Sequence, residues 1–140
     1  MTSGERTRAQ LVFGAADGVT LGLGLIVGLM ATPHALVHGA ASAGLAELPG
    51  MAAGAWLANK QAGLIPAAAN GLAAFAACLI PALPYLFLSG AVALAVAVAL
   101  VVAVAAVVAW LRPEHGLAAV GQTFGVLAAA AVLCYAASLI

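Results

Sequence analysis

The sequence predicts an all-α membrane protein in which five transmembrane helices form a single domain. Of its 140 residues, 66% are hydrophobic and 6% are charged, whereas about a quarter of the residues in a soluble domain are charged. Short polar breaks divide the chain into five apolar stretches of about 20 residues, the length that spans a bilayer. All four basic residues fall at alternate breaks, as expected for a chain that crosses the membrane five times.

Each predicted helix is bounded by residues that end or begin helices. Pro33 suits the first turn of the second helix, because its missing N–H is not needed there. Pro81 and Pro84 close the third helix. The fourth helix has no polar side chain between Ala91 and Ala109, so it is expected to face lipid or form a wall. The predicted helices cover residues 10–31, 33–58, 62–82, 85–111 and 116–139.

The basic residues also predict the orientation of the chain. With five spans, the N-terminus and the second and fourth loops lie on one side of the membrane, and all four basic residues are there: Arg6, Arg8, Lys60 and Arg112. The positive-inside rule then places the N-terminus in the cytoplasm and the C-terminus outside. The zero net charge gives no basic surface for nucleic acid. No enzyme motif is present, so we expect no catalytic activity.

Two acidic residues, Asp17 and Glu47, lie inside predicted membrane helices. Charge is costly in hydrocarbon, so such residues mark functional sites. These carboxyl groups must be protonated, hydrated or paired with a bound cation, and a proton-coupled cation transporter uses all three states. The alternative is a structural or partner-binding membrane subunit in which protonated acids only form hydrogen bonds between helices.

Other side chains could complete a cation site. Met51 follows Glu47 by four residues and so shares its helix face; a thioether beside a carboxylate suits a first-row transition metal, although methionine also fills gaps between helices. Asn70 could line a path or simply link two helices. His34 and His38, one turn apart, could bind an ion, but they also suit a plain interfacial position.

Glycines in the first predicted helix indicate a close helix contact. Gly14, Gly18 and Gly22 repeat every four residues beside Asp17, and such ridges let helices approach closely in lipid. If the ridge meets its own copy in a homodimer, two Asp17 carboxyl groups would share a proton or capture a divalent cation. The alternative is packing against another helix of the same chain. A carrier of organic cations would be expected to add aromatic residues around the acid, and the few aromatics here lie mostly near helix ends.

Three segments, in order, resemble the vacuolar iron transporter family. Residues 13–18 read FGAADG, residues 44–48 read GLAEL and residues 79–85 read LIPALPY. The first is similar to the FGxxDG signature of that family, and the others are similar to its GLAEL and LIPLLPY segments. The resemblance spans nearly the whole chain and has the same five-helix pattern.

The resemblance implies a homodimeric carrier in a membrane such as the bacterial plasma membrane, exporting Fe²⁺ or Mn²⁺ from the cytosol in exchange for protons. It implies a path at the dimer interface, with Asp17 and Glu47 as transport carboxylates and no permanently bound cofactor. The chain departs from the family in two respects. Either Met51 or Ala55 aligns with the family methionine, and the inner glutamate is absent. Residues 59–63 also stand where many members carry an acidic metal-binding insertion.

Overall fold

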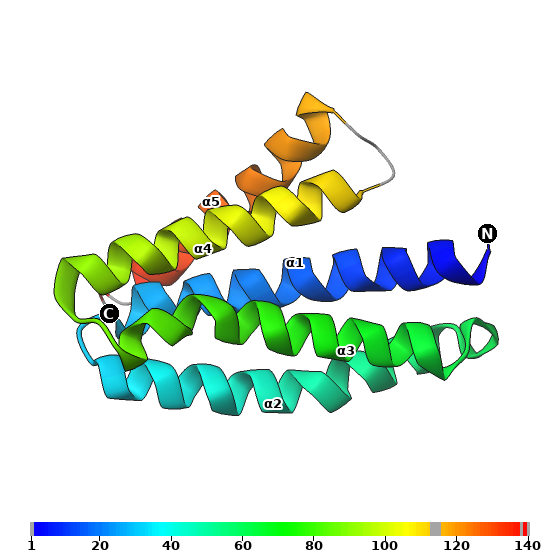
Figure 1. Cartoon of the computed structure of the whole chain (residues 1–140), viewed down its shortest axis with the longest axis horizontal. Helices are drawn as coiled ribbons and strands as arrows, with labels where there is room; N and C mark the ends of the chain where they lie inside the picture. Colours follow the sequence, from blue (N-terminus) through cyan, green and yellow to red (C-terminus); the bar gives the residue numbers. More distant parts are fainter. Residues whose placement is uncertain (1, 113–115, 138, 140) are drawn as a thin grey trace.

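The computed structural model describes residues 2–112, 116–137 and 139, and within them the fold is all-helical. Helices α1, α2 and α3 lie side by side, while α4 and α5 incline away from them toward the end that carries the N-terminus (Figure 1). Two 3₁₀ segments, η1 and η2, precede and follow α3. The bounds are α1 Ser3–Leu29, α2 Pro33–Ala58, η1 Lys60–Ala62, α3 Leu64–Leu79, η2 Ile80–Leu86, α4 Gly90–Leu111 and α5 Leu117–Ala137.

The first helix begins well before the predicted residue 10. Thr2 caps it: its hydroxyl accepts a hydrogen bond from the Glu5 backbone N–H at 3.2 Å, and the Glu5 carboxylate accepts one from the Thr2 N–H at 2.7 Å. This capping box satisfies free N–H groups of the first turn and so extends the helix into polar sequence. The predicted bounds of α2 are confirmed, with Pro33 in its first turn.

The predicted boundary between the third and fourth helices is wrong by several residues. Pro81 and Pro84 lack the N–H that an α-helix needs, and the chain forms η2 instead of continuing α3 or starting α4. Helix α4 begins at Gly90, whose φ of 60° is in the left-handed region that favours glycine. The predicted fifth helix agrees with α5 to within a residue at its start; its predicted final turn includes residue 138, which lies outside the described residues.

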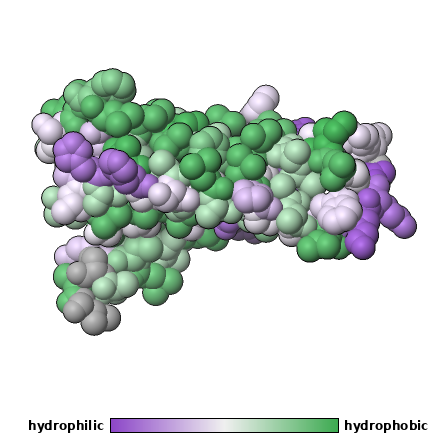
Figure 2. All heavy atoms as spheres, turned by 90° about the horizontal axis from the view of Figure 1, so that it is seen from below, coloured by the Kyte–Doolittle hydropathy of each residue, from purple (hydrophilic) through white to green (hydrophobic). Residues whose placement is uncertain are grey.

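Among the described residues, four segments are long and apolar enough to cross a membrane, which identifies an integral membrane protein: Ser3–Leu29, Leu64–Leu86, Gly90–Leu111 and Leu117–Ala137. Helix α2 is as long but less apolar, since it carries His34, His38 and Glu47, and it falls short by composition. In Figure 2 apolar residues cover most of the length of one face, and hydrophilic residues gather at its two ends.

Glycine lets α3 pack tightly between α1 and α2. A side chain at Gly14 or Gly18 would collide with the backbone carbonyl oxygen of Asn70 or Ala74, and one at Gly22 would come within 2.9 Å of the Cys78 carbonyl oxygen. The ridge predicted from the sequence is therefore filled by α3 of the same chain. The hypothesis that this ridge forms a dimer contact is therefore wrong, because α3 of the same chain already covers this face of α1.

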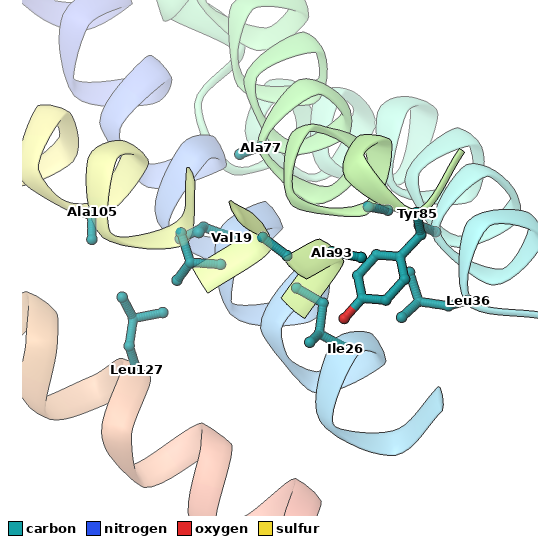
Figure 3. Packing of buried hydrophobic residues seen from close by; sticks show 12 residues of the cluster. Val19, Ile26, Leu36, Ala77, Tyr85, Ala93, Ala105 and Leu127 are labelled. Carbon is teal, nitrogen blue, oxygen red and sulfur yellow. The ribbon is translucent and has the colours of Figure 1, made fainter. Parts of the chain in front are cut away.

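The hydrophobic core lies where α1, α2, η2 and α4 meet. In Figure 3 the Tyr85 ring of η2 lies near Ile26 and Leu36, and Leu127 of α5 points toward Val19 and Ala105. Helix α4 buries a narrow edge of alanine and valine, mostly at four-residue spacing, and most of its other side chains are exposed. Helix α5 is the least buried of the candidate spans. The buried residues of α5 are Ala119, Thr123 and Leu127.

Candidate functional site

The structure brings Asp17 of α1 and Glu47 of α2 together. Their carboxyl groups lie side by side. They are close enough to repel each other when both are charged, and to share a proton when one of them is protonated. Glu47 is half-buried, and its Oε2 accepts no hydrogen bond from any described residue. Asp17 is more exposed. Two carboxyl groups from separate helices therefore form the centre of the candidate site.

Asn70 occupies the junction of α1, α2 and α3. Its side chain is only 2% exposed, and its Nδ2 donates a hydrogen bond of 3.1 Å to the Met51 carbonyl oxygen on α2. Its Oδ1 lies against Gly14 of α1, 2.7 Å from where a Cβ atom would stand, and accepts no hydrogen bond from a described residue. Leaving such a buried acceptor unpaired costs about 1–3 kcal/mol. The hydrogen bond links α3 to α2, and a role of Asn70 in lining a path stays a prediction.

Met51 lies one turn from Glu47 and is half-buried. The position of Met51 is fixed through its backbone carbonyl oxygen, which accepts a hydrogen bond from the Asn70 side chain. Its role as a thioether ligand stays a prediction. Within the described part of the chain, no three His, Cys, Asp or Glu side chains cluster closely enough to hold a metal ion. A cation at Asp17 and Glu47 would therefore need additional ligands from amide, backbone or thioether groups, or from water.

A crevice of about 720 Å³ separates α1 from α4 and α5, and Asp17 lies on its wall. Most of the lining is alanine, valine and other apolar residues, but Arg112 also lines it. The Arg112 guanidinium donates to the Gln122 Oε1 at 2.9 Å and to the Thr123 hydroxyl at 3.5 Å, both on α5. The crevice thus contains a cationic group as well as the Asp17 carboxyl group.

Sequence reasoning missed this position of Arg112, which was assigned only to a loop. A signal was present: Gln122 and Thr123 are adjacent polar residues early in an otherwise apolar helix, and Arg112 immediately follows α4. Two hydrogen-bonding side chains one or two turns into α5 are within reach of a long arginine side chain at the start of the preceding loop.

The two histidines lie at the opposite end of α2 from the basic residues, and both are exposed. The Nδ1 of His38 lies 2.8 Å from the His34 carbonyl oxygen, so this ring nitrogen is already engaged with the backbone of its own helix. The pair is separate from the Asp17–Glu47 site.

The fold and this site define an α-helical membrane protein with an acidic pair between two of its helices. Comparison with known protein families, curated proteins and solved structures finds no match to the chain.

Proposed function

We propose that this protein is a carrier of divalent metal ions, Fe²⁺ or Mn²⁺, that moves metal out of the cytosol in exchange for protons. The observation that carries the proposal is the pairing of Asp17 and Glu47 on adjacent helices of a membrane protein. Two close carboxylates attract a divalent cation, and neutralising them with protons releases it. The resemblance of three sequence segments to the vacuolar iron transporter family supports the same function.

The proposed topology has five membrane spans, namely the four apolar segments described above and α2. Its packing supports this, because α2 lies against α1 and α3 along its length and holds Glu47 beside Asp17. A cytoplasmic N-terminus is supported by the basic residues, which gather at one end: Arg6 donates to the Gln61 carbonyl oxygen and Arg8 to the Leu111 carbonyl oxygen. The proposed assembly is a homodimer whose contact excludes the Gly14–Gly18–Gly22 ridge.

Metal uptake by proteoliposomes tests the function. With an acidic interior, protons leaving the vesicles should drive Mn²⁺ or Fe²⁺ inward. We expect Asp17→Asn and Glu47→Gln each to lower uptake by about tenfold or more, because a neutral amide cannot balance the charge of the metal. Glu5→Gln is the matched control, since glutamine also completes a capping box and Glu5 is exposed.

Full uptake by Asp17→Asn would contradict the mechanism. If the purified protein neither binds nor carries Mn²⁺ or Fe²⁺, the acids are structural and the chain is a packing or partner-binding subunit. Direct metal binding that is lost in Glu47→Gln would instead favour the carrier.

A further inference from the structure

The crevice between α1 and the α4–α5 pair has the size of a ligand site and the depth of one lipid leaflet. Its volume of about 720 Å³ falls within the range of about 300–1,000 Å³ that is typical of ligand pockets. Its α1 wall extends from Ala9 to Thr20, which is about 17 Å at 1.5 Å rise per residue. The hydrocarbon core of a bilayer is about 30 Å thick, so the crevice extends through roughly half of it.

The walls of the crevice leave apolar surface uncovered by the protein. The crevice lies where α4 and α5 incline away from α1 (Figure 1). Phe13 on the α1 wall is 62% exposed, and Val126 on the α5 wall is 61% exposed. Exposed apolar side chains that face each other across a cavity are stabilised when hydrocarbon fills it. In a bilayer, the hydrocarbon at hand is the acyl chain of a lipid.

Two arginines lie at the end of the crevice that is nearer the N-terminus. The Arg8 Nε donates to the Leu111 carbonyl oxygen at 2.7 Å and so extends from α1 to the end of α4. Arg112, the next residue after α4, lines the crevice itself. Trp110 lies two residues before it and is 71% exposed, as expected for an aromatic residue at the level of the lipid headgroups. The two guanidinium groups are therefore at the depth of a lipid phosphate.

Arg8 has N–H groups to offer to a phosphate. Its bond to Leu111 places positive charge at the C-terminal end of α4, where cations stabilise a helix, but this bond uses Nε alone. Arg8 is exposed, and its terminal amino groups donate to no residue in the described ranges. Guanidinium groups bind phosphate oxygens through parallel N–H donors. The Asp17 carboxyl group is eight residues beyond Ala9 on α1, or about 12 Å deeper, so it lies at the level of the acyl chain and away from the phosphate.

We propose that this crevice binds an anionic phospholipid from the leaflet on the side of the N-terminus. The phosphate lies beside Arg8 and Arg112, and one acyl chain lies between α1 and α5. Basic pockets between membrane helices recognise anionic headgroups in this way. The inference concerns a second site, and it stands whether or not the protein carries metal.

Native mass spectrometry of the full chain in detergent tests the site. Phosphatidylglycerol and phosphatidylcholine with the same acyl chains are compared, because they differ in the net charge of the headgroup. Each arginine near an anionic headgroup contributes a factor of about five, so we expect phosphatidylglycerol to bind about 25-fold more tightly, and Arg8→Gln and Arg112→Gln each to reduce that preference about fivefold. Lys60→Gln is the matched control: it removes one positive charge at the same end, where Lys60 lies over Trp56 and does not line the crevice.

A second variant tests where the acyl chain lies. Ala16 lines the crevice below the arginines, so Ala16→Leu should lower the retention of both lipids by narrowing the cavity. Size-exclusion profiles establish that each variant folds; if Arg112→Gln does not, Arg8→Gln decides, because Arg8 is exposed. Equal binding of the two lipids by the parent protein would overturn the proposal. An equal effect of Lys60→Gln and Arg8→Gln would also overturn it, as would unchanged binding by folded Ala16→Leu.

Discussion

The α1–α2–α3 unit and the α4–α5 pair pack in different ways. In the first, glycine lets helix backbones contact one another directly. Gly14 and Gly18 contact the α3 backbone, and Gly71 contacts the Leu48 carbonyl oxygen of α2. In the second, α4 and α5 meet the rest through alanine, valine and leucine side chains, and a Cβ atom added at either glycine of α5 would have no neighbour within 4 Å. The tight unit holds the polar groups of the candidate site, and the looser pair bounds an apolar crevice.

The largest expected effect comes from enlarging a glycine in the tight unit. Gly18→Leu would force a side chain into the Ala74 backbone, which cannot move aside as a side chain can. Overpacking costs about 1–3 kcal/mol and sometimes more, so we expect a strong loss of thermal stability in detergent. Gly125→Leu on α5 is the matched control, because nothing lies within 4 Å of that position. Equal losses in both variants would remove the distinction between the two regions.

A smaller effect is expected at Arg112, whose hydrogen bonds link the end of α4 to α5. Arg112→Ala removes hydrogen bonds to Gln122 and Thr123, and bonds from a charged donor contribute about 1.5–3 kcal/mol. Thermal unfolding should show a loss near the lower limit, since Gln122 is exposed. A double-mutant cycle with Gln122→Leu isolates the contact, with an expected coupling of about 0.5–1 kcal/mol. Zero coupling would mean that the bond to Gln122 does not stabilise the protein, and that only the bonds to Ala119 and Thr123 could hold Arg112 on α5.

The smallest effect is expected at the junction of the two regions. Tyr85 is 8% exposed in the core, and its hydroxyl has no partner among the described residues. Tyr85→Phe removes an unpaired polar atom and keeps the ring between Ile26 and Leu36 (Figure 3), so stability should stay level or rise by up to about 1 kcal/mol. A clear loss in thermal unfolding would show that the hydroxyl is bonded in the membrane.

Helix locations could be predicted from the sequence where apolar length and proline decide them. Pro33 and Asn59 bound α2 as expected, but hydropathy could not reveal the polar first turns of α1, which depend on the Thr2–Glu5 capping box. Nor could it reveal that the prolines after α3 form η2, because this requires knowing that the chain stays helical without the α-helical hydrogen bonds.

Only part of the candidate site could be predicted from the sequence. The two acids could be identified from their cost in a membrane, and consecutive antiparallel helices bring Asp17 and Glu47 to similar depth. The partner of the glycine ridge could not be identified, because glycine spacing specifies a close approach and not the helix that makes it. Arg112 was missed because its long side chain leaves the loop and enters the crevice.

The glycine ridge also constrains how the chain is made. Gly14 on α1 meets Asn70 on α3, a contact across 56 positions of the chain (70 minus 14). Synthesis proceeds from the N-terminus, so α1 is complete long before its covering helix exists, and Asp17 is made before its partner Glu47. Until α3 is inserted, the glycine face of α1 therefore lacks the backbone contacts that cover it in the folded chain.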